Sequence, residues 1–328
     1  MRIAIVGAGA IGAYLGAKLA LAGEDVTLIA RSSHLEAMQK NGLTLLAVGN
    51  DGEEVREHAT PLAVETPTQA GPQDVVILTL KAHQVSAISN LLSPMLAPNT
   101  SVITAQNGVP WWYFYGYEGA LSGTRLASVD PENVIWNAIK PERVIGCVVY
   151  PATELVAPGI VRHISGDRFA LGEPDGSRSD RVRALSQTLV SAGLRAPVRR
   201  NLRNEMWIKL WGNVAFNPIS VLTGETLGSI CAHSGTRSLA RDVMLEAQSV
   251  AHALGEKFTI NVDQRIEGAA AVGEHKTSML QDFERGRRLE IAAIVGAVAE
   301  LGNLVNIATP KIEMLYTLTR LIDHRLSP

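Results

Sequence analysis

The chain has 328 residues, of which 46% are hydrophobic and 19% are charged, with a formal net charge of −2 and a pI of about 6.5. A chain of this length can bury a large core and usually forms two domains, and its charge argues against a general affinity for nucleic acid. Two distant cysteines, Cys147 and Cys231, exclude a disulfide framework and favour the cytoplasm, and no cluster of Cys and His has zinc-ligand spacing.

The first segment of the chain is a largely apolar run over 3–22, which could imitate a secretion signal or a membrane span. Lys18 interrupts this run, glycines punctuate it, and its apolar pattern changes at Gly7. We therefore predict a buried strand followed by a helix, and we expect no association with a membrane.

Strands and helices alternate through the first half of the chain. Strands are predicted over 2–7, 25–31, 74–80 and 100–108, and helices over 10–23, 34–42 and 83–96. Extended segments over 144–150, 159–164 and 168–172 precede a helix over about 180–192. Alternation of this kind implies a parallel sheet with right-handed crossovers, so the fold class is α/β with an N-terminal Rossmann-type doubly wound sheet.

The pattern changes near residue 200, where strand-like alternation stops. Helices are predicted over 205–224, 238–255, 277–286, 288–303 and 309–325. We place the boundary in the basic stretch VRRNLRN, which predicts a dinucleotide-binding domain over 1–198 and an all-helical C-terminal domain over 199–328.

The stretch GAGAIG at 7–12 matches the glycine pattern of a dinucleotide-binding loop, and it lies between a predicted strand and a predicted helix. Gly7 would allow the tight turn, Gly9 the approach of a pyrophosphate, and Gly12 the close packing of helix on strand. The N–H groups at the start of the helix would then bind the phosphates. A glycine-rich turn that binds nothing is the other interpretation.

The end of the second predicted strand favours NADP over NAD. NAD enzymes of this fold usually place Asp or Glu about 20 residues after the loop, bonded to the ribose 2′-hydroxyl. This chain has Ala30, Arg31, Ser32 and Ser33 there. A guanidinium beside hydroxyls suits a 2′-phosphate, although a solvated loop arginine would give the same sequence.

Three polar residues in MWIKLWGNVAFNPIS, 206–220, follow one another at intervals of four: Lys209, Asn213 and Asn217. That spacing places them on one face of a helix. Taken alone, this face is most simply the solvent-exposed side of an amphipathic helix. The alternative is the wall of a cleft that binds a polar ligand, where a fixed cation could stabilise negative charge on a substrate oxygen.

With these features in view, the chain resembles the ketopantoate reductase (2-dehydropantoate 2-reductase) family over nearly its whole length. The matching pieces are GAGAIG at 7–12, LTLKAHQ at 78–84, AQNG at 105–108, KLWGNVAFNP at 209–218 and TSMLQDFERGRRLEI at 277–291, of which the last two are the more specific. The resemblance implies a Rossmann domain followed by an all-helical domain, NADP(H) as cofactor and a small 2-oxo acid as substrate.

The resemblance also implies roles for individual residues. Lys209 would donate a proton to the ketone oxygen, and Glu290 would lie between cofactor and substrate. The implied substrate-binding residues are Asn107, Asn213, Asn217 and Ser278. The implied cofactor-binding residues are Gly7, Gly9, Ala10, Ile11, Gly12, Arg31, Lys81, Gln84 and Asn107. On the sequence alone, Glu290 could equally pair with a neighbouring arginine at the surface, which would stabilise the protein little.

An aromatic-rich insertion at about 110–140 departs from the family pattern. Six of the chain's sixteen aromatic residues lie in VPWWYFYGYEG, at 109–119. These rings could pack the insertion or an interface between subunits. They could instead form a lid or pocket wall, which would favour a substrate larger or more apolar than ketopantoate.

The sequence therefore predicts an NADPH-dependent reductase that converts ketopantoate to (R)-pantoate in pantothenate and coenzyme A synthesis. One alternative is the same chemistry on a bulkier 2-oxo acid, and another is an NADPH-binding regulator without turnover. Lys209 and Glu290 speak against the regulator, because a sensor needs neither. We expect no metal and no nucleic-acid partner, and the sequence leaves room for a homodimer.

Overall fold

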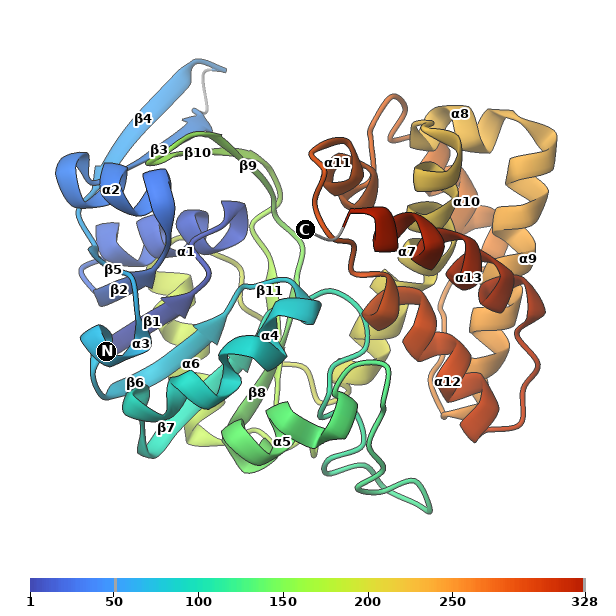
Figure 1. Ribbon diagram of the computed structural model, residues 1–328, viewed down its shortest axis with the longest axis horizontal. Helices are drawn as coiled ribbons and strands as arrows, with labels where there is room; N and C mark the ends of the chain where they lie inside the picture. Colours follow the sequence, from blue (N-terminus) through green and yellow to red (C-terminus); the bar gives the residue numbers. More distant parts are fainter. Residues whose placement is uncertain (50–51, 327–328) are drawn as a thin grey trace. The chain divides into compact units, whose positions relative to one another are not determined.

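The computed structural model describes residues 1–49 and 52–326, and the chain divides into two compact units (Figure 1). The sheet unit comprises Met1–Gln106, Trp112–Arg125 and Glu132–Leu202. The helical unit comprises Asn107–Trp111, Leu126–Pro131 and Arg203–Pro328. In the described part of the chain, we find no helix with the length and apolar character that crossing a bilayer requires.

A seven-stranded sheet forms the centre of the sheet unit, in the order β11-β8-β7-β6-β1-β2-β5. Six neighbouring strands, β8, β7, β6, β1, β2 and β5, are parallel, and the edge strand β11 pairs with β8 in the antiparallel direction. Apart from β11, this is the strand order of the Rossmann fold, so the predicted doubly wound sheet is confirmed. The strands are β1 (Arg2–Val6), β2 (Asp25–Ile29), β5 (Leu62–Val64), β6 (Gln73–Leu78), β7 (Leu96–Thr104), β8 (Val144–Val149) and β11 (Phe169–Gly172).

A second sheet of four strands, in the order β4-β3-β10-β9, was largely missed by the sequence analysis. Only β10 coincides with a predicted segment. The sequence of β4, EVREHA, is mostly exposed and has no apolar alternation, so its pairing partner rather than its own pattern determines its structure. These strands are β3 (Leu43–Val48), β4 (Glu54–Ala59), β9 (Ala152–Ala157) and β10 (Ile160–Ser165).

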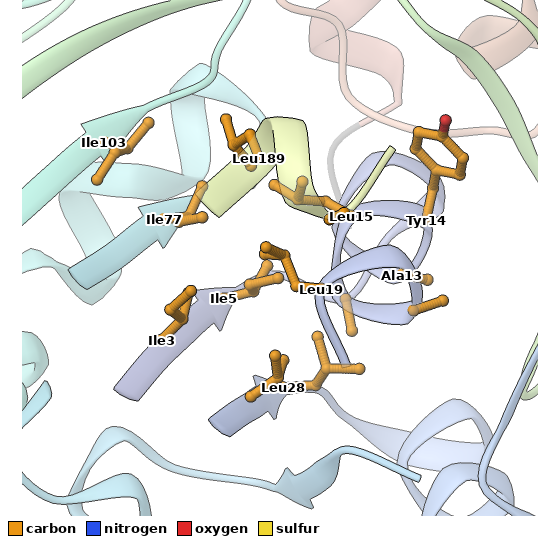
Figure 2. Close-up of a cluster of buried hydrophobic side chains, with 14 of the residues drawn as sticks. Ile3, Ile5, Ala13, Tyr14, Leu15, Leu19, Leu28, Ile77, Ile103 and Leu189 are labelled. Carbon is orange, nitrogen blue, oxygen red and sulfur yellow. The ribbon is translucent and has the colours of Figure 1, made fainter. Parts of the chain in front are cut away.

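Helix α1 (Ala10–Leu21) contacts both sheets, which explains the apolar run at the start of the chain. Figure 2 shows Leu15 and Leu19 beside Ile5 and Leu28 of the central sheet. On another side of the helix, the ring of Tyr14 stacks on His163 of β10, with 4.8 Å between ring centroids. A helix buried on several sides needs apolar residues around its whole circumference.

The remaining helices of the sheet unit are short. The helix predicted over 83–96 ends early, because α4 stops at Ser89 and the next turns, which contain Pro94, form a 3₁₀ helix. The helices are α2 (Ser32–Asn41), α3 (Pro67–Ala70), α4 (Ala82–Ser89), α5 (Val134–Ile139) and α6 (Asp180–Ser191), with 3₁₀ helices η1 (Asn90–Met95), η2 (Pro131–Asn133) and η3 (Pro141–Arg143).

The C-terminal part of the chain is helical, as predicted. Two of its helices, α8 and α10, have no counterpart in the sequence analysis, because they are only six and nine residues long. The elements are α7 (Leu202–Thr223), α8 (Leu227–Ala232), α9 (Ser234–Ala253), α10 (Val262–Ala270), α11 (Ser278–Glu284), the π-helix η4 (Ala292–Gly296), α12 (Ala297–Leu304) and α13 (Pro310–Arg325).

Most of the aromatic insertion belongs to the sheet unit, although Trp111 and Leu126–Pro131 belong to the helical unit. Trp112, Tyr113 and Phe114 are each no more than 1% exposed. The Nε1 of Trp112 donates a hydrogen bond of 2.8 Å to the hydroxyl of Thr104, and its ring lies so close to Gly146 of β8 that a Cβ there would be 2.6 Å from ring carbons. These three rings therefore serve the core of this unit and do not form an exposed wall.

Candidate active site

The glycine loop joins β1 to α1 at the carboxyl end of the central strand. Gly7 has a φ of +100°, and a Cβ there would lie 2.7 Å from Leu80. A Cβ on Gly12 would lie 2.2 Å from the carbonyl oxygen of Gly7. By contrast, a Cβ on Gly9 would have no atom within 4 Å. Gly7 and Gly12 are therefore required by packing, whereas Gly9 leaves open space over the loop.

This open space coincides with the N-terminus of α1. Gly9 is the N-cap residue and has no side chain to bond the first turn, so the N–H groups of Ala10, Ile11 and Gly12 lack the usual capping partner. Backbone N–H groups and the positive end of the helix dipole favour an anion here. The residues present thus fit the pyrophosphate of a dinucleotide.

Arg31 lies close to this loop along the backbone. The N–H groups of Gly7 and Ala8 both donate to the carbonyl of Ile29, each at 3.2 Å, and Arg31 follows two residues later. Its side chain is exposed, and the next residue, Ser32, has a φ of +54°. Arg31 is thus an exposed residue in a segment whose backbone adjoins the glycine loop, and its binding of a ribose phosphate stays a prediction.

Residues after β6 support the same loop. The hydroxyl of Thr79 donates to the carbonyl of Gly7 at 2.6 Å, a contact that the sequence analysis missed because threonine there carries no motif.

The side chain of Gln84 accepts the N–H of Lys81 at 3.1 Å and so caps α4. Gln84 therefore has a structural role, and its contact with a cofactor stays a prediction, as does that of Lys81.

The sequence analysis also gave no role to His34, which lies in the first turn of α2. Its Nδ1 accepts the N–H of Gly159 at 2.9 Å, and burial lowers the pKa of its imidazole. The ring is therefore neutral near pH 7, and it ties the segment that follows Arg31 to the second sheet. A single histidine without a motif gives no sequence signal for such a role.

In the helical unit, α7 carries the three polar residues on one face. Lys209 and Asn213 are partly buried and Asn217 is 4% exposed, so this face is not simply a solvated stripe. The ammonium of Lys209 donates to Oδ1 of Asn107 at 2.7 Å. The structure therefore brings two of the predicted site residues together, although 102 positions separate them in the chain.

Two hydroxyl groups connect the backbone of Asn217 to Thr277, the residue before Ser278. The hydroxyl of Ser220 donates to the carbonyl of Asn217 at 2.8 Å and lies 2.6 Å from the hydroxyl of Thr277. Thr277 caps α11 and leaves Ser278 exposed at the first position of that helix. Within the described residues, the buried Nδ2 of Asn217 has no hydrogen-bond partner, which is unusual for a buried amide and typical of a binding residue.

Glu290 is 6% exposed, so the alternative of a solvated surface pair is wrong. The helix predicted over 288–303 is also wrong at its start, because residues 287–290 are not helical and the helix begins at Ile291. Gly286, with a φ of +65°, terminates the preceding helix, and the N–H of Leu289 donates to the side chain of Asp323 instead of a helix carbonyl.

The segment that carries Asn107 docks on the turn after Glu290. The N–H of Val109 donates to the carbonyl of Ala293 at 2.9 Å, and Gly108 has a φ of +88°. A Cβ on Gly108 would lie 2.4 Å from the same carbonyl oxygen. Ala293 belongs to the π-helix η4, and π-helical turns often occur at functional sites. Lys209, Asn107 and the segment of Glu290 are thus linked within one unit.

No group of His, Cys, Asp and Glu side chains in residues 1–49 and 52–326 has the arrangement of a metal site. The sheet unit carries a dinucleotide loop, and the helical unit carries a half-buried ammonium, amides and a carboxylate. Such groups can hold a small polar molecule and supply a proton to an oxygen.

Comparison with known proteins agrees with this chemistry. Residues 3–176 match the family Ketopantoate reductase PanE/ApbA, and residues 201–323 match Ketopantoate reductase PanE/ApbA C terminal. The chain belongs to the ketopantoate reductase family. The 2-dehydropantoate 2-reductase of Mesorhizobium japonicum is 56% identical over 98% of this chain and 97% of the relative, and that of Pyrococcus horikoshii is 31% identical over the same shares.

Solved ketopantoate reductases have the same fold. The enzyme of Ralstonia eutropha superposes with a TM-score of 0.84 at 29% identity and 99% coverage of both chains. That of Geobacter metallireducens gives 0.83 at 32% identity and full coverage of both. D-mandelate dehydrogenase, solved with NADH and anilino(oxo)acetate, shares the fold at a TM-score of 0.81, 23% identity and 99% coverage of both chains.

Gly108→Ala should break the link between Asn107 and the π-helix. The matched control is Gly255→Ala, at a φ of +87° with open space around it. We expect the control to lower the free energy of unfolding by about 1–2 kcal/mol, the usual penalty of a left-handed residue. Gly108→Ala should lower it by roughly 1–3 kcal/mol more, because the methyl group overlaps the Ala293 carbonyl. Equal losses in urea denaturation would contradict the docking described here.

Proposed function

We propose that this protein is an NADPH-dependent 2-dehydropantoate 2-reductase, which reduces ketopantoate to (R)-pantoate for pantothenate and coenzyme A synthesis in the cytoplasm. The observation that carries the proposal is the relative of that name, 56% identical along 98% of this chain. Residues 1–198 would bind NADP(H), and 199–328 would supply the catalytic and substrate-binding residues. Cys147 and Cys231 are buried and form no disulfide, which agrees with a reducing compartment.

Lys209 is the proposed proton donor. When bound, NADPH would supply the hydride for the ketone carbon, and the negative charge that develops on the carbonyl oxygen has to be stabilised by the protein. The ammonium of Lys209 stabilises that negative charge and transfers a proton to it, then regains a proton from water. Asn107 accepts a hydrogen bond from the same ammonium at 2.7 Å, which fixes its position before the substrate arrives.

The other residues bind and orient the reactants. Asn213 and Asn217 supply amides to the substrate's hydroxyl and carboxylate without adding opposing charge, and Ser278 contributes a hydroxyl to the carboxylate. The carboxylate of Glu290 lies between substrate and cofactor in this proposal. Gly7, Gly9, Ala10, Ile11 and Gly12 hold the pyrophosphate, Arg31 holds the 2′-phosphate, and Lys81, Gln84 and Asn107 complete the cofactor site.

A bulkier 2-oxo acid is the second candidate substrate, because the fold also occurs in a D-mandelate dehydrogenase solved with anilino(oxo)acetate, a phenyl-bearing amide of oxalic acid. The aromatic insertion no longer supports it, since Trp112, Tyr113 and Phe114 are buried in the core. We therefore favour ketopantoate. Turnover of a phenyl-bearing 2-oxo acid at least as fast as ketopantoate would reverse this choice, and cofactor binding with turnover of neither would favour a regulator.

Lys209→Ala should lower kcat for ketopantoate by about 10²- to 10⁴-fold, the usual contribution of a general acid. The affinity for NADPH, measured by fluorescence titration, should change little, because Lys209 acts on the substrate oxygen. Lys257→Ala, an exposed lysine of the same unit, is the control and should retain full activity. A kcat of Lys209→Ala within a few-fold of wild type would exclude the proton-donor role.

Arg31→Ala should weaken binding of NADPH by about 10- to 100-fold, because a charge-assisted hydrogen bond to the 2′-phosphate is lost. NADH lacks that phosphate, so its KM should change by less than about twofold on this account. Arg56→Ala, at a side chain 73% exposed on β4, serves as the control. Equal loss of NADPH and NADH binding would show that Arg31 does not read the 2′-phosphate.

We also propose a homodimer formed through α13. Met314, Leu318 and Leu321 are 60%, 47% and 61% exposed and lie on one face of this helix. Antiparallel packing of two copies of α13 would bury this face. It would also place Glu313 of one copy near Arg320 and Arg325, in the last turns of α13 in the other copy. Leu318→Asp should then give the monomer mass in light scattering. A wild-type protein that is monomeric at the same concentration would contradict the dimer.

A further inference from the structure

A buried carboxylate lies next to the segment of Glu290 and belongs to none of the motifs. Asp323, in the last turns of α13, is 4% exposed. Its Oδ1 accepts the backbone N–H of Leu289 at 2.7 Å. Its Oδ2 accepts two hydrogen bonds from the guanidinium of Arg288, at 3.0 Å from Nε and 2.9 Å from Nη2.

These bonds act on the two residues immediately before Glu290. Charge-assisted hydrogen bonds are the stronger class, and Asp323 also raises the pKa of the Arg288 guanidinium above its ordinary value. Leu289 is 2% exposed, so its N–H has to find an acceptor inside the protein. The carboxylate of Asp323 supplies that acceptor.

Asp323 opposes a local tendency to form helix. The sequence from Arg288 onward has helical periodicity, and η4 and α12 follow directly. If the helix extended back through Leu289, Glu290 would adopt helical backbone angles. The helical repeat of about 100° per residue would then fix the direction of its side chain around the helix axis. Instead, Glu290 stands at the helix start, where its carbonyl accepts the N–H of Ile294 at 3.1 Å.

We propose that Asp323 is a positioning residue, which fixes the direction of the Glu290 carboxylate through its hydrogen bond to the backbone of Leu289. Its effect on catalysis rests on the proposed function, since Glu290 is a site residue only there. The constraint on the segment itself does not rest on that function.

The chain offers a matched control at the other end of the same helix. Glu246 accepts the N–H groups of Lys311 and Ile312, at 3.1 and 3.0 Å, in the first turn of α13. It is also a carboxylate that bonds backbone N–H groups, but it bonds no residue of the 287–290 segment. Glu246, which belongs to α9, thus bonds the backbone of α13, and Glu246→Ala reports the cost of losing such a carboxylate without disturbing Glu290.

Asp323→Ala removes the acceptor of the Leu289 N–H and should lower kcat for ketopantoate by about 10- to 100-fold, because a small misplacement of a catalytic group has effects of this size. The dissociation constant of NADPH should stay within about twofold, since the glycine loop is untouched. Glu246→Ala should lower Tm comparably and leave kcat unchanged. A kcat loss of the same size in both variants would mean a general structural effect and would overturn the proposal.

Arg288→Lys separates the two contacts of Asp323. Lysine cannot form the two-pronged guanidinium contact, but the Leu289 bond remains, so we expect kcat to fall by less than about threefold. A loss as large as that of Asp323→Ala would overturn the assignment to Leu289. If Asp323→Ala does not fold, Asp323→Glu shifts the acceptor by one methylene group, and an unchanged kcat in that variant would also overturn the proposal.

Amide hydrogen exchange tests the constraint without turnover. In the cofactor-free protein, exchange at Leu289 should be at least about tenfold faster in Asp323→Ala than in wild type, and unchanged in Glu246→Ala. Unchanged exchange at Leu289 in Asp323→Ala would overturn the proposal. If wild type reduces neither 2-oxo acid, the proposed function fails, while faster exchange would still establish that Asp323 fixes this segment.

Discussion

A half-buried ammonium needs an acceptor, and the acceptor of Lys209 determines much of the helical unit. Asn107 can meet it only because its segment docks on Ala293, and that docking needs Gly108, whose missing Cβ leaves room for the carbonyl. The carbonyl of Ala293 belongs to a π-helical turn, which begins at Ala292, two residues after the non-helical Glu290. One hydrogen bond thus depends on a glycine, a wide helical turn and an interrupted helix.

The sheet unit meets a different requirement, which is to leave a helix N-terminus uncovered. Gly7 and Gly12 are fixed by contacts with their own neighbours, and only Gly9 leaves open space. The second sheet and the central sheet enclose α1, so that its first turn is rigid although it has no side-chain cap. Rigidity is a condition for binding phosphate by backbone groups, since those groups cannot adjust as side chains do.

Much of this could be predicted from the sequence because the information is local. The glycine loop, the strand–helix alternation and the spacing of Lys209, Asn213 and Asn217 all lie within short windows. What failed depends on distant partners. Strand β4 is a strand because β3 pairs with it, and residues 287–290 leave the helical pattern because Asp323 and Gly286 act on them. The burial of Glu290 has the same origin, so sequence alone could not separate it from a surface residue.

Each unit is built from three separate stretches of the chain, so no single cut divides the chain into the two units. The chain passes between the sheet unit and the helical unit at 106/107, 111/112, 125/126, 131/132 and 202/203. Glu300 of α12 accepts the backbone N–H groups of Ala127 and Ser128, so the early segments are bonded into the late one. A chimera that joins two family members at residue 202 would therefore combine the helices of one parent with the Asn107 segment of the other. Because these parts are hydrogen-bonded to each other, evolution by exchange of whole domains at that point is restricted.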